Sequence, residues 1–359
     1  MCASPASPSE PPPVPGLAEE AKGSWRTRWI RLLAVAVSVI ALAAVGLHGR
    51  LPDPKEFLTA LTGAEYGWVA LATLLQIASI AAFAGQQQRL LGSLGVRLRR
   101  RRLMAITLAR TAISISVPAG GAVSTGYAIR EFERAGAARE IGAVCAVVSG
   151  LASIGGLALI YAGGGAVLLT YSSTTSLTWR PLIIVAVLVA LTGAAVALGR
   201  RLTDEPLDAE PAKHHGRVAR YLHGLLVSAR DAWRAGAGLR ARDWWAVLGY
   251  ATANWLTDLF CLAACTRALG LPVDLIALAG IYLGVQIVRQ VPLTPGGIGV
   301  IETALVAGLT TSGATAISAT AAVLIYRLLS CWLLIPVGGV AALVLRRPGS
   351  GRATPDSGR

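Results

Sequence analysis

The sequence is poor in charged residues for its length, and it contains few cysteines and histidines. Only 14% of the 359 residues are charged, whereas 54% are hydrophobic and the mean hydropathy is +0.59. This composition excludes an intrinsically disordered chain and is typical of a polytopic membrane protein. Helices in such a protein pack through small residues, and the 40 glycines suit that packing.

Several motifs of metal sites and hydrolytic enzymes are absent. The five cysteines include no CxxC pair and have no matching histidine pairs, so we expect no metal site. The sequence has no HExxH, no GxSxG and no cluster of carboxylates near a histidine. We therefore predict that the protein is not an enzyme and that it needs no cofactor.

Acidic residues are much rarer than basic ones. The chain has 19 Asp and Glu against 33 Lys and Arg, which gives a formal charge of +14. The arginines stand in clusters between apolar segments, and this distribution indicates the positive-inside bias of a membrane protein. We expect contact with membrane lipids that have anionic headgroups, and no binding of nucleic acid.

Apolar segments of membrane-spanning length recur along the chain. We predict six full spans, at residues 30–47, 66–85, 141–162, 181–199, 244–266 and 317–345. Gln86 to Arg89 are expected to leave the second span, a polar loop is expected at 170–178, and Tyr326, Arg327 and Pro336 are expected to interrupt the last span.

These segments divide the chain into two membrane halves joined by a basic linker. The predicted parts are a Pro-rich disordered cytoplasmic tail (1–24), a first membrane half (25–199), a basic cytoplasmic linker (200–242), a second membrane half (243–347) and a disordered tail (348–359).

Two further apolar stretches, near residues 103–136 and 275–311, contain helix-breaking residues. Proline removes an amide donor and clashes with the preceding turn, so neither stretch continues as a straight helix. The breaking residues are Pro118 in the first stretch and Pro292, Pro295 and Gly299 in the second. We predict that each stretch forms a re-entrant hairpin. For the second stretch, the alternative is a structural turn between two packed half-helices.

Charge counting orients this arrangement. If the N-terminus is cytoplasmic and the two hairpins enter from opposite faces, every arginine cluster lies on the cytoplasmic side. The predicted fold is thus an all-α polytopic membrane protein with two re-entrant broken helices in an inverted-repeat arrangement. We expect it in the cell membrane, with both termini cytoplasmic. Transporters use such paired broken helices to build a substrate site near the midplane.

Charged residues and exposed amides in the predicted membrane segments are candidate ligands for an anionic lipid headgroup. Arg110 and Arg289 would supply bidentate cations. The amides of Gly120, Gly121, Gly296 and Gly297 would point toward the headgroup from the starts of the returning half-helices. Glu302, Arg327 and Asp258 complete the candidate set.

Each of the charged candidates also has a structural interpretation. Glu302 and Arg327 are alternatively a structural ion pair, because an unpaired charge at membrane depth is costly. Arg110 alternatively extends toward the membrane surface. Asp258 and Asn254, which are one helical turn apart, alternatively only bridge neighbouring helices.

The residues from Arg289 to Glu302, followed by Tyr326-Arg327, resemble the signature of the transmembrane region of lysylphosphatidylglycerol synthases. The resemblance, to a flippase-like family, covers roughly residues 30–345. Many members carry a polar, acidic motif after the first proline, where this sequence has Ala119, Gly120, Gly121 and Ala122. The resemblance implies a standalone membrane member without the aminoacyl-transferase domain, since the sequence ends at Arg359 soon after the last predicted span.

The function that we expect from these features is translocation of a lipid between leaflets. The expected substrate is an anionic or aminoacylated phospholipid or a polyprenyl-phosphate-linked lipid. The alternatives are a membrane-embedded lipid-modifying enzyme and an accessory scaffold in cell-envelope assembly. A homo-oligomer and a separate lipid-synthesising enzyme remain open as partners.

Overall fold

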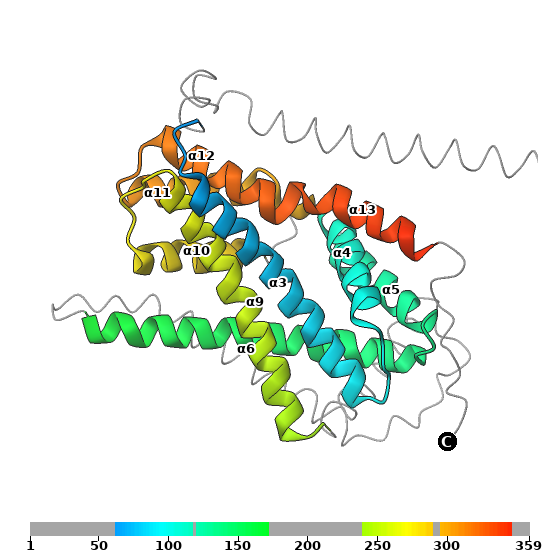
Figure 1. Ribbon diagram of the computed structural model, residues 1–359. Helices are drawn as coiled ribbons and strands as arrows, with labels where there is room; N and C mark the ends of the chain where they lie inside the picture. The colour runs from blue at the N-terminus through cyan, green and yellow to red at the C-terminus, as the bar shows by residue number, and fades with distance from the viewer. Residues whose placement is uncertain (1–61, 118–119, 172–238, 290–294, 347–359) are drawn as a thin grey trace, which may run out of the picture. The chain divides into compact units, whose positions relative to one another are not determined.

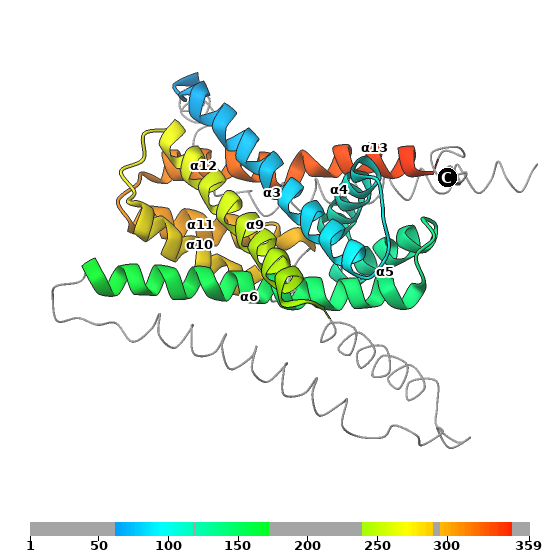
Figure 2. The ribbon, with the colours of Figure 1, turned by 60° about the horizontal axis from the view of Figure 1, so that its bottom comes forward.

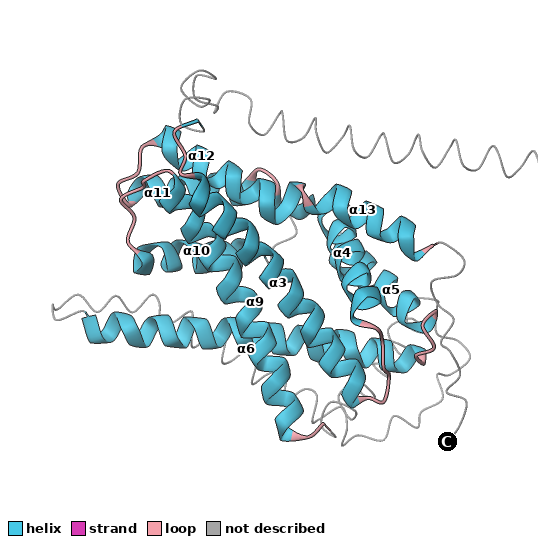
Figure 3. Ribbon diagram, in the orientation of Figure 1, coloured by secondary structure: helices cyan, strands magenta, loops and turns pink. Residues whose placement is uncertain are grey.

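The computed structural model describes residues 62–117, 120–171, 239–289 and 295–346, and all regular structure in these ranges is helical (Figure 1; Figure 3). This agrees with the predicted all-α class. The predicted spans at 30–47 and 181–199, both tails, nearly all of the linker, and Pro118, Ala119 and Pro292 lie outside the described residues.

Three helices in the described part of the chain are long and apolar enough to cross a membrane, namely Tyr66–Ser93, Arg139–Gly164 and Ala316–Leu345. The first is α3, and the second belongs to α6 (Arg139–Tyr171). Helix α9 (Ala241–Ala268) has 28 residues but is not among the three, because polar residues such as Asn254 and Asp258 lower its hydropathy. Helix α9 begins at Ala241, so the linker predicted to extend to residue 242 ends two residues earlier, at residue 240.

Helix α3 is longer than predicted. The span was expected to end at Gly85, but the helix continues to Ser93. Gln86 and Gln87 are each only 1% exposed, because both side chains donate hydrogen bonds to Ser149 on α6. Likewise α6 extends through Tyr171, into the predicted polar loop.

Helices α3 and α9 form an antiparallel pair. At one end, the Glu65 amide donates to the Ala268 carbonyl at 2.8 Å. In the middle, the Ser79 hydroxyl donates to the Asn254 side chain at 3.0 Å. At the other end, Arg89 and Asp243 form a 2.7 Å ion pair. The views in Figures 1 and 2 both show these two helices side by side.

The first broken stretch forms helices α4 (Arg100–Ser116) and α5 (Gly120–Glu133), which pack against each other. Their 17 and 14 residues are too few to cross a hydrocarbon core about 30 Å thick. The start of α5 passes so close to α4 that a Cβ on Gly120 would lie 2.2 Å from the Ser114 carbonyl oxygen. Glycine is therefore required at this position.

The second broken stretch forms α10 (Leu275–Arg289), a short 3-10 turn (Pro295–Gly297) and α11 (Val300–Thr311). Helices α10 and α11 also pack against each other, and their outer bounds coincide with the predicted 275–311. Gly296, Gly297 and Gly299 have φ values of 62°, 68° and 88°, a region that favours glycine.

The last long helix is continuous through Tyr326 and Arg327, where an interruption was predicted. Helix α12 (Ala316–Arg327) passes through a π-helical turn (Leu328–Trp332) into α13 (Leu334–Leu345). The Leu333 amide bonds to the Leu328 carbonyl, five residues earlier. Pro336 has no amide to offer the Trp332 carbonyl, so a widened turn just before it relieves the clash without ending the helix.

Buried apolar residues gather in two large clusters. The first cluster, which we call the arginine-side core, contains Leu90 of α3. It also contains Leu103 and Phe132, which are at the two ends of the α4–α5 hairpin, and Leu345 packs at its edge. It is flanked in sequence by Arg97–Arg102, Arg240, Arg242 and Arg346. The second cluster, which we call the opposite core, contains Leu278 and Leu309, which are at the two ends of the α10–α11 hairpin. Helices α3, α6 and α9 contribute to both clusters.

Candidate functional site

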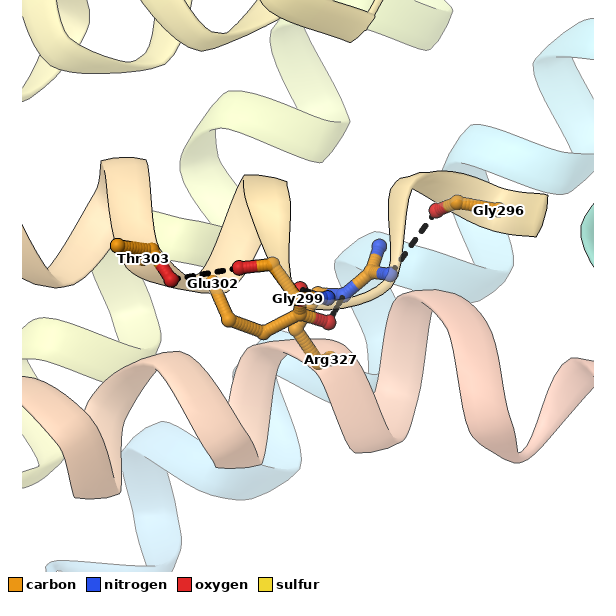
Figure 4. A network of polar contacts seen from close by, with 5 residues as sticks. All are labelled: Gly296, Gly299, Glu302, Thr303 and Arg327. Atoms are coloured by element: carbon orange, nitrogen blue, oxygen red, sulfur yellow. Dashed lines mark hydrogen bonds and ion pairs between the residues drawn. The ribbon is translucent and has the colours of Figure 1, made fainter. Parts of the chain in front are cut away.

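Glu302 and Arg327 form a buried ion pair at the turn of the second hairpin (Figure 4). The Arg327 Nε donates to the Glu302 Oε1 at 2.6 Å, and its Nη2 donates to the Gly296 carbonyl at 3.1 Å. The Arg327 side chain is only 4% exposed and the Glu302 side chain only 9%. Arg327 on α12 therefore holds the backbone of the hairpin turn in place.

The sequence around Glu302 explains how α11 begins. Gly299 is the N-cap residue, and Glu302 is at the third helical position. The Glu302 Oε2 accepts the Gly299 amide at 2.7 Å, which satisfies a donor that the helix start would otherwise leave unpaired. The Thr303 hydroxyl donates to the Gly299 carbonyl at 2.6 Å.

These contacts favour the structural interpretation of Glu302 and Arg327. Each charge is matched by the other. In addition, the Glu302 Oε2 accepts from the Gly299 amide and the Arg327 Nη2 donates to the Gly296 carbonyl. Their function in this conformation is to shape the hairpin turn, in which the backbone of Gly296 and Gly297 is left in tight positive-φ conformations.

Asp258 lies in a second buried network that joins three helices. Its Oδ2 accepts the Tyr282 hydroxyl of α10 at 2.7 Å and the Tyr326 hydroxyl of α12 at 3.0 Å. Asn254, one turn away on α9, receives the Ser79 hydroxyl of α3, so both polar residues bridge neighbouring helices, as the structural interpretation predicted. Sequence reasoning gave Tyr282 no role and did not link Tyr326 to Asp258; the available signal was that both tyrosines stand in apolar segments, where a buried hydroxyl needs a partner.

Arg110 on α4 faces α3. Its guanidinium carbon lies 5.1 Å from the centroid of the Phe83 ring. Within the described ranges, no carboxylate comes within ion-pair distance of Arg110. Cys145 lies nearby, and its thiol donates to the Gln87 side chain. Arg110 is thus a cation beside a neutral polar cluster between α3 and α6 that sequence reasoning did not find.

Arg289 is at the exposed end of α10, immediately before the undescribed residues 290–294. As for Arg110, the part of the chain that the structure describes places no carboxylate at ion-pair distance from it. Both cations predicted as headgroup ligands at the hairpins, Arg110 and Arg289, therefore lack an acidic partner in these ranges.

The two hairpins meet near their turns. A Cβ on Gly296 would lie 3.0 Å from the carbonyl oxygen of Ile115, which is in the last turn of α4. Gly120, at the start of α5, is buried, whereas Gly121 is exposed. The structure thus brings Gly296, Gly299, Glu302 and Arg327 together, with Asp258 attached through Tyr326, and leaves Arg110 farther back along α4.

These features define a multi-pass, all-helical membrane protein in which two broken-helix hairpins meet. The family model described as the lysylphosphatidylglycerol synthase TM region matches residues 31–338. The chain belongs to this family, as the hairpin signature indicated. It is 23% identical over 331 residues to a UPF0104 membrane protein of Methanothermobacter thermautotrophicus, across 87% of this chain and 94% of that relative.

Proposed function

We propose that this protein is a lipid translocase that moves a lipid with an anionic phosphate group between the leaflets of the cell membrane. The substrate class comprises anionic or aminoacylated phospholipids and polyprenyl-phosphate-linked lipids. The proposal rests on one observation: two short helical hairpins meet at Ile115 and Gly296, and each carries an arginine without a carboxylate partner among the described residues.

The chemistry of the headgroup explains this arrangement. A phosphate that leaves water needs cations and hydrogen-bond donors to replace its hydration. Arg110 and Arg289 would supply bidentate donors, and the start of α5 would supply amides at its positive dipole end. The Glu302–Arg327 pair would serve a different purpose, which is to keep the broken backbone of the second hairpin rigid.

The orientation follows from the charges. The segments that flank the arginine-side core are rich in arginine, whereas the described turns that flank the opposite core carry Glu65, Arg267 and Asp274. We infer that the arginine-side end faces the cytoplasm and that the α4–α5 hairpin enters the membrane from that side, with α10–α11 entering from the other.

The test is translocation of a fluorescent phosphatidylglycerol in proteoliposomes made with the purified full chain. We expect Arg289→Gln and Arg110→Gln to slow movement by about tenfold or more, because each loses a charge-assisted pair with the phosphate. Arg139→Gln is the matched control. This change also removes one arginine charge, but the side chain is 82% exposed and its ion pair with Glu133 is long at 3.7 Å. Wild-type protein that moves no anionic lipid, or an Arg289→Gln variant as fast as wild type, would contradict the proposal.

A further inference from the structure

A second candidate lipid site lies at the arginine-side end of the α3–α9 pair. The end of α3 and the start of α9 line an open pocket of about 880 Å³. We call it the α3–α9 basic pocket. Its charged lining residues are Arg89, Arg97, Arg240, Arg242 and Asp243.

The charges of this pocket do not balance. Asp243 is 9% exposed and pairs with Arg89 at 2.7 Å, so this carboxylate is already matched. Arg97, Arg240 and Arg242 are exposed and have no carboxylate within ion-pair distance in the described ranges. The Nε of Arg89 is buried without a hydrogen-bond partner in the same ranges. Among the residues that the structure describes, the pocket therefore carries three unmatched positive charges and an unused donor, which is an environment for an anion.

Small residues on α3 make room for a ligand. Gly85 and Gly92 line the pocket two turns apart on the same side of the helix. The Tyr250 ring packs so closely on Gly85 that a Cβ there would lie 2.8 Å from it. A Cβ on Gly92, by contrast, would meet nothing within 4 Å. The wall at Gly92 is thus open, and the start of α9 at Ala241 adds a positive dipole end beside it.

The surroundings indicate the level of a lipid headgroup. Along α3, exposed aliphatic residues such as Leu74 and Ile77, at 63% and 56%, give way to Gln88 and Arg89 in the pocket. On α9, Trp245 is 71% exposed, and Tyr250 in the pocket wall is 42% exposed. Exposed aromatic residues next to arginines are typical of the boundary between hydrocarbon and headgroups.

We propose that the α3–α9 basic pocket binds the phosphodiester group of an anionic membrane lipid, separately from the hairpin site. Asp243 in this pocket and Asp258 in the hairpin region are both on α9, about 22 Å apart at 1.5 Å per residue. The lipid tails would lie along the exposed aliphatic surface of α3. This proposal does not depend on translocation, because it concerns binding alone.

The test is a titration of the purified full chain in mixed micelles with phosphatidylglycerol, followed by native mass spectrometry and thermal unfolding. Phosphatidylcholine with the same acyl chains and inorganic phosphate are the comparison ligands. We expect phosphatidylglycerol to bind and to raise the unfolding temperature. The double variant Arg240→Gln/Arg242→Gln should bind it about 25-fold more weakly, at about fivefold for each arginine.

A second variant tests the pocket without changing its charge. Gly92→Leu should abolish the binding, because the leucine side chain occupies the open wall. Gly67→Leu is the matched control, because Gly67 is on the same helix and also has nothing within 4 Å, but lies outside the pocket. Equal binding by Gly92→Leu, Gly67→Leu and wild type, or stabilisation by inorganic phosphate but not by phosphatidylglycerol, would overturn the proposal. Because no lipid movement is measured, a failure here is separate from a failure of translocase activity.

Discussion

At the scale of single residues, two buried charges of the described structure, Glu302 and Arg327, hold broken backbone in place, and a third, Asp258, joins three helices. Glu302 accepts the amide of Gly299, the N-cap residue of α11, and Arg327 binds both Glu302 and the carbonyl of Gly296. Asp258 is held by two tyrosine hydroxyls from different helices. Because Tyr326 and Arg327 are adjacent, one turn of α12 supports both networks.

The Glu302–Arg327 pair gives a sharp stability prediction. Arg327→Met should lower the free energy of unfolding by about 3–5 kcal/mol, because the Glu302 carboxylate then stays buried without its partner. The double variant Glu302→Gln/Arg327→Met should recover part of that loss, since no unpaired charge remains. Thermal or denaturant unfolding in detergent measures both effects.

An exposed arginine provides the control for this prediction. Arg139→Met removes an ion pair with Glu133 in which the two charged atoms are 3.7 Å apart. The Arg139 side chain in this pair is 82% exposed. Surface pairs of this kind contribute at most about 1 kcal/mol. If Arg327→Met lowered the free energy of unfolding no more than Arg139→Met does, the Glu302–Arg327 pair would not stabilise the fold.

At the scale of elements, close backbone contacts determine where the hairpins turn. Gly120 lets α5 start directly against the Ser114 carbonyl, and Gly338 lets α13 approach the Leu108 carbonyl of α4, where a Cβ would lie 2.3 Å away. The α4–α5 hairpin is therefore fixed both at its own turn and along its contact with α13.

Adjacent glycines allow a matched test of the first turn. Gly120→Ala should destabilise the protein by about 1–3 kcal/mol or more, because the added methyl group overpacks against backbone that cannot rotate away. Gly121→Ala should have little effect on stability, because a Cβ there meets nothing within 4 Å. Unfolding temperatures of the two variants decide the point: equal values would mean that α5 does not start as close to α4 as described.

At the scale of the whole molecule, the described helices place their charges unevenly. Both ends of the α4–α5 hairpin lie at the arginine-side core, and both ends of the α10–α11 hairpin lie at the opposite core. This is the arrangement that the positive-inside argument requires if each hairpin returns to the face from which it entered.

Cysteine labelling tests this topology. In a Cys2→Ser background, Thr311→Cys should react with a membrane-impermeant maleimide on intact cells, because it is an exposed residue at the opposite end. Ala138→Cys, exposed in the turn after α5, should react only after permeabilisation. The native Cys145, Cys261, Cys265 and Cys331 are buried and should stay silent. The reverse labelling pattern would invert the proposed orientation.

The sequence by itself determined the all-helical class, the family and the bounds of the second hairpin. Apolar length, proline and glycine act locally, so helices and breaks such as 275–311 can be read from neighbouring residues. The same reasoning failed at Gln86 and Gln87, whose burial depends on Ser149. It also failed at Tyr326, because α12 continues past this residue into the π-helical turn that precedes Pro336.

Only the tertiary structure decided which charges are matched. Arg110, Arg289 and Arg327 look alike in sequence as cations near broken helices. Arg327 is paired because α12 packs beside the start of α11, whereas Arg110 faces an aromatic ring and Arg289 stands at an exposed helix end. Pairing depends on distance between side chains far apart in the chain, and helix periodicity along one segment carries no information about that distance.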